Sequence, residues 1–361
     1  MTSPSRRRFL TAAGSFAAGG TLLLAQQAEK RADDPLGPDA QAAVDRGLAY
    51  LGRAQSDDGS YPDGQFSSGN VAVTALAGLA LMAGGHQPGR GLYGRSVSRA
   101  VDYVMRRQSP IGLLSSTEAA VSHAAMYQHG FGTLFLAEAY GMMPEPSRNA
   151  RVRDALDRAV SLILSSQQRT EAAGWRYDTR PNDADVSVTV AMMMALRAAR
   201  NAGLTVPKSA IDAAVRYVKG CQSNDGGFVY KMGQQFTGSA FARSAAAVVG
   251  LYSAGIYEGR EIDNGLNYLI KYVPGKRFGG GQDVRPEYYF YGQYYAGLAM
   301  WTAGGQYWTE WFPAIRDELL SRGRGAGVGV WQDTLHGPAF ATACACIILQ
   351  LPNNYLPILQ K

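Results

Sequence analysis

Cysteines, histidines and long hydrophobic runs are scarce in this sequence, and each scarcity excludes a class of protein. The 361 residues include only three cysteines and four histidines. Cys344 and Cys346 stand two apart in a helical pattern and point to different faces, so no disulfide framework is expected. No two histidines have metal-ligand spacing on one helix, and we expect neither a metal nor an organic cofactor.

Charge is also limited, because only 18% of the residues are Asp, Glu, Lys or Arg and the formal net charge is +6. No run of lysines or arginines forms a basic patch, so the sequence gives no reason to expect a nucleic acid partner. Beyond the N-terminal segment, no stretch approaches the ~18 apolar residues that a membrane-spanning helix needs.

The N-terminus predicts export. Residues 5–10 read SRRRFL and precede an uncharged, weakly hydrophobic stretch that ends at Ala25. This pattern resembles a twin-arginine signal, which exports folded proteins, and we expect residues 1–28 to be that signal peptide. A general secretory signal or an uncleaved anchor is the alternative. The location implied is the periplasm or cell envelope, and residues 29–39 are interpreted as a linker.

An internal repeat dominates the remaining residues, 40–361. Four segments place aliphatic residues seven and four positions before a glutamine, which puts both on one face of a helix. A glycine-bearing turn and a large apolar residue follow each glutamine. The glutamines are Gln55, Gln108, Gln167 and Gln222, and two weaker copies follow near residues 273 and 330.

A second, more apolar helix is expected after each turn. A hydroxyl or amide recurs near its start, at Thr74, Thr133, Thr189, Ser244, Gln293 and Thr342. Helices that are apolar all round must be buried, whereas the first helices carry more charge and suit an outer layer. The sequence therefore predicts an all-α protein, a single (α/α)6 toroid of about six two-helix repeats. An open solenoid is the alternative.

The turns after the glutamines resemble degenerate forms of the repeat of squalene cyclases, and the segment GCQSNDGGF resembles that of protein prenyltransferase β subunits. The resemblance covers residues ~40 to 361 and implies the α/α toroid of this superfamily. The zinc-binding Asp-x-Cys pair of prenyltransferases has no counterpart, because Lys219 and Gly220 precede Cys221.

One acidic pair resembles the catalytic motif of squalene-hopene cyclases, Asp-x-Asp-Asp-Thr. Here the segment reads Asp183-Ala184-Asp185-Val186-Ser187, with valine in place of the third aspartate. The resemblance implies that Asp185 is the acid that protonates a carbon-carbon double bond and that Asp183 is its neighbour. Protonating an alkene needs a strong acid held by a positively polarised partner, for which His129 and Arg243 are candidates.

An aromatic run opens the fifth inner helix and supplies further candidates. Ring faces stabilise carbocations and also line apolar pockets. Successive aromatic residues point all round a helix, so some of them must belong to the core. The candidate substrate-binding residues are Tyr289, Tyr291, Gln293, Tyr294, Trp301 and Arg243.

Two functions remain open on the sequence. The first is a cyclase-like isomerase acting on an isoprenoid lipid, with Asp185 as the acid and Asp183 and His129 adjusting it. The second is a non-catalytic toroid that binds a lipid, a glycan or a protein. A hydrophobic, isoprenoid-like small molecule is the expected ligand, and peripheral contact with a membrane would bring the protein to it.

Overall fold

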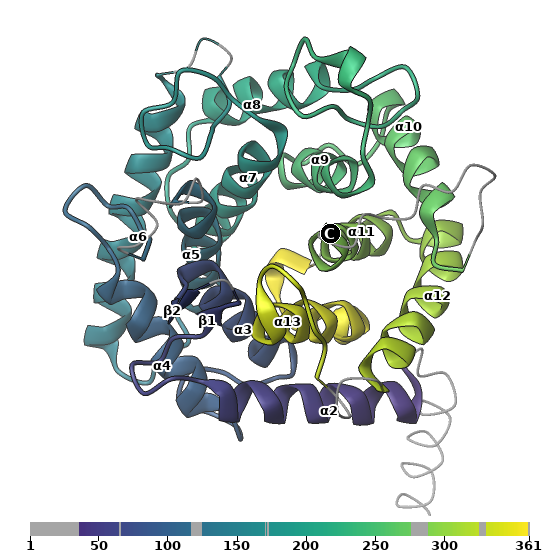
Figure 1. The fold of residues 1–361 in the computed structure, drawn as a ribbon. Coiled ribbons are helices and arrows are strands. Elements are labelled where there is room, and N and C mark those ends of the chain that lie inside the picture. Colours follow the sequence, from purple (N-terminus) through teal and green to yellow (C-terminus); the bar gives the residue numbers. More distant parts are fainter. Residues whose placement is uncertain are drawn as a thin grey trace, which may run out of the picture.

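The chain forms two concentric rings of helices (Figure 1). The computed structural model describes residues 36–64, 66–116, 125–169, 171, 173–275, 288–324 and 330–359. The outer ring consists of α2 (Gly37–Ala54), α4 (Gly94–Arg106), α6 (Pro146–Gln167), α8 (Lys208–Gly220), α10 (Arg260–Leu269) and α12 (Gly305–Arg324). The inner ring consists of α3 (Val71–Ala83), α5 (Ala125–Ala139), α7 (Val186–Asn201), α9 (Phe241–Ser253), α11 (Tyr289–Ala303) and α13 (Gly337–Gln350).

The two rings are closed. Each inner helix packs against the inner helices before and after it, and α13 packs against α3. On the outside, α12 meets α2 (Figure 1). The predicted (α/α)6 toroid is therefore confirmed over the open solenoid, and closure leaves no repeat with an uncovered end.

Burial separates the two layers as the sequence predicted. In α4 only one face is buried, including Val97, Val101 and Val104, and arginines occupy the exposed face. In α3 nearly every side chain is buried, because the helix has inner neighbours on both sides and outer helices behind it. The many alanines and glycines of the inner helices allow this close packing.

The recurring glutamine holds neighbouring repeats together. Its side-chain amide donates one hydrogen bond to a carbonyl of its own turn and a second to a carbonyl in the next outer helix. The paired acceptors are Gly59 and Ser96 for Gln55, Gly112 and Ala155 for Gln108, Ala173 and Ala210 for Gln167, and Gly226 and Glu261 for Gln222. The repeat signal thus reports a structural bond rather than a ligand site.

The large apolar residue of each turn and the hydroxyl of the inner helix also form a pair. The backbone N–H of that residue donates to the hydroxyl in the pairs Tyr61–Thr74, Trp175–Thr189, Phe228–Ser244 and Trp331–Thr342. In the second repeat the buried residue at this place is Leu114, one position later than the sequence pattern indicated, and its N–H donates to His129.

The turn glycine is required by both conformation and space. Gly112 has φ of 91°, and a Cβ built on it would lie 2.5 Å from the Arg158 carbonyl oxygen. Gly112→Ala is expected to lower the free energy of unfolding by roughly 2–4 kcal/mol, measured by urea denaturation. Ala173 occupies the same place at φ of 58°, so Ala173→Gly is the matched reverse change. A Gly112→Ala protein as stable as the wild type would contradict this role of the turn glycine.

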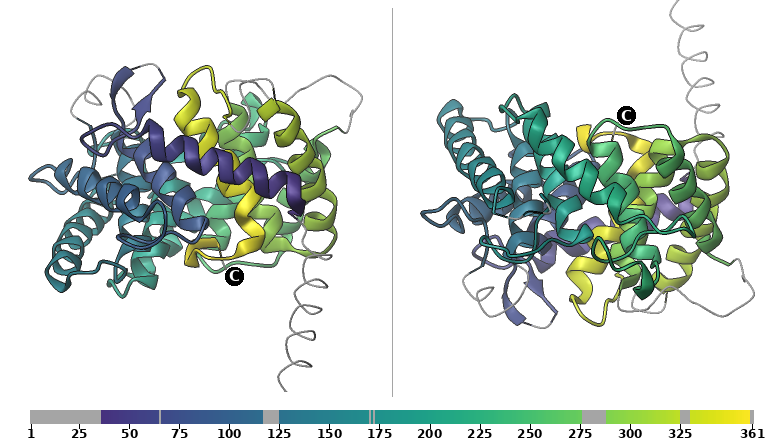
Figure 2. Two further views of the ribbon diagram at one scale, coloured as in Figure 1. Left: turned by 90° about the horizontal axis from the view of Figure 1, so that it is seen from below. Right: turned by 90° about the horizontal axis from the view of Figure 1, so that it is seen from above.

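The two ends of the ring differ (Figure 2). At one end the hairpin of β1 (Pro62–Asp63) and β2 (Phe66–Gly69) lies over the first residues of α3 and α13. There Asp63 accepts a hydrogen bond from Asn70, and its Oδ1 lies 3.4 Å from Nδ1 of His336. The C-terminal segment lies at the other end. We call the end where the inner helices begin the rim.

Two sequence predictions concern the ends of the chain. The predicted signal peptide, residues 1–28, and most of the linker lie outside the described residues. The first outer helix begins at Gly37, three residues before the expected start of the toroid. Across the described ranges, none of the helices combines the length and the apolar character needed to cross a bilayer.

Candidate functional site

Asp185 is a buried carboxyl group at the rim. It is the N-cap of α7, and its Oδ1 accepts a hydrogen bond from the Val188 backbone N–H at 2.9 Å. The residue is 0% exposed, and its Oδ2 has no hydrogen-bond partner. The nearest positive charge is Nη1 of Arg176, 3.7 Å from Oδ2. Capping therefore explains one oxygen of this carboxyl group, whereas the other lies at ion-pair distance from Arg176 and accepts no hydrogen bond.

Burial determines the acidity of Asp185. Desolvation raises its pKa from 3.8 to about 6, although the hydrogen bond from Val188 and the charge of Arg176 both lower it. Removal from water therefore outweighs the cation, because the guanidinium lies beyond hydrogen-bonding distance. Near neutral pH a minority of the molecules therefore carries a protonated Asp185, which is the form that a proton donor needs.

Asp183 lies at the surface beside Asp185, with a side chain 48% exposed. It forms ion pairs with Arg176, whose Nε lies 3.1 Å from Oδ1 of Asp183, and with Lys231. Because Asp183 engages Nε of Arg176, it fixes the guanidinium that faces Asp185. The contacts of Asp183 thus place it as a neighbour that orients Arg176.

His129 is fully buried in α5, and both of its ring nitrogens have backbone partners. Nδ1 accepts from the Leu114 N–H at 3.1 Å, which leaves Nε2 to donate to the Ala159 carbonyl at 3.2 Å. Burial lowers its pKa to about 4, so the ring is neutral. These bonds hold the second turn against α6, and the predicted effect of His129 on Asp185 stays a prediction.

Five phenols lie within electrostatic range of the buried carboxyl group. Burial raises the pKa of each, and the charge of Asp185 raises it further; they are Tyr127, Tyr177, Tyr217, Tyr230 and Tyr291. The guanidinium of Arg176 lies over the rings of Tyr177 and Tyr230, whose hydroxyls contact each other. The wall around Asp185 is thus mostly aromatic.

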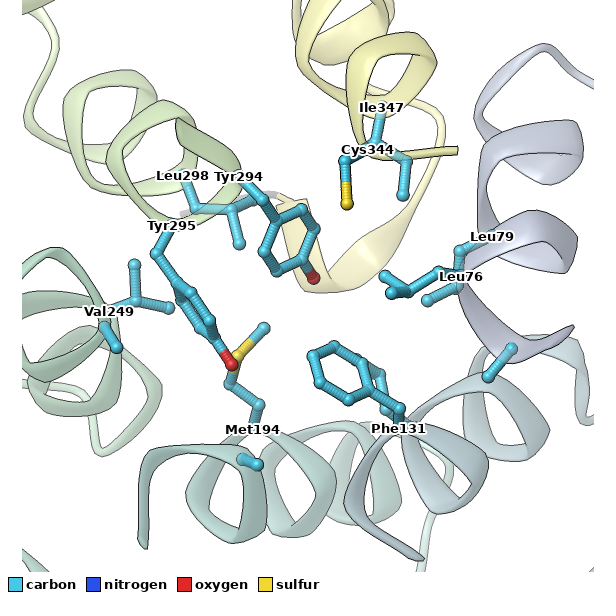
Figure 3. Close-up of a cluster of buried hydrophobic side chains, with 14 of the residues drawn as sticks. Leu76, Leu79, Phe131, Met194, Val249, Tyr294, Tyr295, Leu298, Cys344 and Ile347 are labelled. Atoms are coloured by element: carbon cyan, nitrogen blue, oxygen red, sulfur yellow. The ribbon is translucent and has the colours of Figure 1, made fainter. Parts of the chain in front are cut away.

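The aromatic wall continues toward the axis of the toroid. Successive ring contacts run from Tyr177 to Tyr127, Tyr291, Tyr295, Tyr294 and finally Phe131, with centroid distances between 4.8 and 6.4 Å. The last three of these rings gather at the centre of the inner ring, together with Leu76 and Leu79 of α3, Met194 of α7 and Ile347 of α13 (Figure 3). The hydroxyls of Tyr291 and Tyr295 are buried without hydrogen-bond partners. The axis is therefore lined by ring faces and apolar groups.

The structure separates the remaining candidate residues. Tyr291 and Tyr294 belong to the series of rings at the axis. Tyr289 instead lies beneath the Arg322 guanidinium of α12, and Trp301 packs on Trp308 of the same outer helix. Consecutive aromatic residues cover different faces of α11, so these two face the outer layer.

The two polar candidates also have structural contacts. Arg243 donates to the carbonyls of Phe228 and Gly238, which binds it to the fourth turn. Gln293 is buried on α11 with its Oε1 unpartnered, at the place where other inner helices carry the turn-binding hydroxyl. Neither residue contacts Asp185 through a hydrogen bond or an ion pair in the described part of the chain.

Sequence reasoning missed Arg176, Tyr127, Tyr177 and Tyr230. A usable signal was present, because Tyr177 and Tyr230 both stand two positions after the large aromatic residue of their turns, Trp175 and Phe228. Alternate residues of an extended segment share a face, so Tyr177 is expected on the same side as Trp175, and Tyr230 on the same side as Phe228. Their approach to Asp185 depends on two adjacent repeats and is not visible in either one.

Metal ligands do not gather in the part of the chain that the structure describes: no group of three or more His, Cys, Asp or Glu side chains is placed to hold an ion. The three cysteines are buried and unpaired there, and burial raises the pKa of Cys221 to about 12. A buried thiol of this kind behaves as a small apolar side chain.

Comparison with known proteins identifies the fold. No family model matches the sequence, and neither does any curated protein. Among solved structures, an inactive variant of the α-1,6-mannanase of Salegentibacter sp. in complex with α-1,6-mannotriose matches with a TM-score of 0.61 at 8% identity, covering 85% of this chain and 97% of that one.

The type II terpene cyclase MstE from Scytonema matches with a TM-score of 0.56 at 16% identity, covering 88% of this chain and 99% of that one. A variant of the same cyclase in complex with geranylgeranyl dihydroxybenzoate matches equally well, at 14% identity. At identities this low, a structural match shows shared architecture and not shared chemistry. The chain therefore has the α/α-toroid fold that these solved structures share.

Proposed function

We propose that this protein is a squalene-cyclase-like isomerase that starts the cyclisation of an isoprenoid lipid by protonating a carbon-carbon double bond. The observation that supports this most directly is the unpartnered, fully buried Oδ2 of Asp185 at the head of a series of aromatic rings. A carboxyl group in this setting donates a proton into a site with little water.

The reaction needs only groups that are present. The O–H bond of protonated Asp185 breaks as its proton adds to one carbon of the double bond, and the π electrons form the new C–H bond. The other carbon becomes a cation, which the next double bond attacks to close a ring. The faces of Tyr291, Tyr295 and Phe131 stabilise the moving charge through their quadrupoles. Water takes a proton from a neighbouring carbon, whose C–H electrons restore a double bond, and Asp185 takes up a proton from solvent before the next cycle.

The valine in place of the third aspartate of the cyclase motif changes how the acid is held. Val186 is fully buried and contributes no charge. The Val188 N–H and the Arg176 guanidinium are the groups that stabilise the carboxylate left after proton transfer. Arg176, oriented by Asp183, therefore serves as the positively polarised partner in this proposal.

Glycoside hydrolysis fits the same site less well. That chemistry needs two carboxyl groups on either side of the scissile bond. The carboxylate next to Asp185 in the sequence is Asp183, which is engaged by Arg176 and Lys231 at the surface. The competing function is a carrier that binds an isoprenoid lipid unchanged at the aromatic axis.

The test compares wild type with Asp185→Asn and Asp183→Asn during incubation with linear isoprenoid lipids, analysed by mass spectrometry and NMR. We expect a cyclised isomer of unchanged mass from the wild type and a loss of at least about 10³-fold in rate for Asp185→Asn. Asp183→Asn should retain part of the activity. The rate should rise as the pH falls through about 6, as Asp185 becomes protonated.

Each alternative has its own result. A lipid bound equally by the wild type and Asp185→Asn but never converted would identify a carrier. Full activity of Asp185→Asn would eliminate Asp185 as the acid.

A further inference from the structure

A shallow groove lies on the outer surface between α2 and α4, on a different part of the molecule from the rim. Its volume is about 520 Å³. It is lined by Ala49, Gly52 and Arg53 of α2 and by Leu92, Tyr93, Arg95, Ser96 and Arg99 of α4 and the loop before it. The three arginines are not accompanied by any acidic residue in the lining, so the groove is positively charged.

The arginines are available to a ligand. Arg53 and Arg95 are exposed, and neither forms an ion pair or a side-chain hydrogen bond in the described part of the chain. Arg99 donates to the Ser56 carbonyl, which neutralises none of its charge. Guanidinium groups bind phosphate oxygens in a bidentate manner, and an arginine without a carboxylate partner keeps that capacity.

The start of α4 adds two further donors. Tyr93, the N-cap, provides no side-chain hydrogen bond to the helix, and the first turn contains no acid. The backbone N–H groups of Arg95 and Ser96 lack acceptors among the described residues, whereas that of Gly94 donates to Gly91 in the loop and that of Val97 donates to the N-cap Tyr93. Free amides at the start of a helix attract anions, and Arg95 and Ser96 both line the groove that carries the arginines.

An apolar group projects beside these charges. Leu92 is 80% exposed, at the end of the loop between α3 and α4. Tyr93 forms the floor of the groove against Gly52, where a Cβ would lie 2.8 Å from the tyrosine ring. A leucine exposed to this extent has no role in the core, and its position next to unpaired arginines matches the boundary between lipid headgroups and acyl chains.

We propose that this groove binds the phosphate headgroup of an anionic phospholipid and so attaches the protein to a membrane surface. Arg53 and Arg95 contact the phosphate oxygens, the first amides of α4 complete the contact, and Leu92 enters the region just below the headgroups. The proposal does not depend on the function assigned to Asp185. Binding at this groove orients the toroid with α2 and α4 toward the membrane surface.

The experiment is co-sedimentation of the full chain with vesicles of phosphatidylcholine alone or of phosphatidylcholine and phosphatidylglycerol in equal amounts. We expect binding to the anionic vesicles only, weakened by salt. The double variant Arg53→Glu and Arg95→Glu should reduce this binding by roughly tenfold or more. Leu92→Asp should also reduce it, although it adds only one charge.

Matched controls separate a specific groove from general attraction. Arg216→Glu changes an exposed arginine of α8, on the far side of the ring (Figure 1). Phe236→Asp changes an apolar side chain that is 85% exposed in the 3-10 helix Gln235–Thr237. Both should bind the anionic vesicles like the wild type. Equal losses in the controls and the groove variants would overturn the proposal, as would an absence of binding. Displacement of the protein from vesicles by millimolar inorganic phosphate, with phosphate-dependent shifts confined to the groove in NMR spectra, would identify a free-phosphate site and also overturn it.

Discussion

Asp185→Asn is expected to increase the free energy of unfolding at neutral pH while it removes the proposed proton donor. Asparagine caps a helix as well as aspartate does, so the hydrogen bond from Val188 is retained. The substitution eliminates a carboxylate that is 0% exposed and only partly compensated by Arg176. One pKa unit corresponds to about 1.4 kcal/mol, so the rise from 3.8 to about 6 limits the gain to about 3 kcal/mol.

The pH dependence provides the sharper test. Because burial raises the pKa of Asp185, the native state binds its proton more tightly than the unfolded state does. The wild type therefore loses stability as the pH rises from about 4 to about 6. The Asp185→Asn protein lacks this loss, so the two proteins should be equally stable below about pH 4 and should differ most above about pH 6. Urea denaturation at several pH values measures the difference.

Asp185→Ala is the control, because it removes the charge and the cap together. It should be less stable than Asp185→Asn by about 1 kcal/mol at every pH. If Asp185→Asn had the stability of the wild type throughout, Asp185 would be an ordinary cap. That outcome would count against Asp185 as a functional residue that the protein keeps at a cost in stability.

Trp331→Ala should lower the free energy of unfolding by about 3–5 kcal/mol, more than the loss of a turn glycine or a helix cap. The Trp331 side chain is 1% exposed, and its Nε1–H donates to the Leu319 carbonyl of α12. Its ring also packs against Gly47 of α2, where a Cβ would lie 3.2 Å from it. Trp331 thus joins the last repeat to the first, at the place where the ring closes.

Trp175→Ala is a matched change in the middle of the ring. Trp175 is also fully buried, with Nε1–H donating to Ile163 and its backbone N–H donating to Thr189. If the toroid unfolds as one unit, both variants should show a single denaturant transition with similar losses and unchanged slopes. Hydrogen exchange should show faster opening of α2 and α13 only in Trp331→Ala. A separate early transition for the last repeat would contradict cooperative closure.

The repeat, the two layers and the closed ring could all be predicted from the amino-acid sequence. The glutamine spacing predicts the outer helices because each amide bonds its own turn and the next repeat, so the pattern must recur with the structure. The uniformly apolar inner helices require burial on every side, which a ring provides. Asp183 and Asp185 both stand just before an apolar helix, and the structure makes Asp185 its cap.

The surroundings of Asp185 could not be predicted in the same way, because they form only in the folded ring. The sequence made His129 a candidate partner of Asp185. The folded chain bonds the His129 ring to Leu114 and Ala159, and it also brings Arg176, which was not among the candidates, to the carboxyl group. Folding also places Tyr291 at the axis and Tyr289 against the outer layer. Helical periodicity specifies that neighbouring side chains point in different directions, but not which direction is inward. That choice, and the acidity of a buried carboxyl group, depend on contacts between repeats about fifty residues apart, which exist only after the ring has closed.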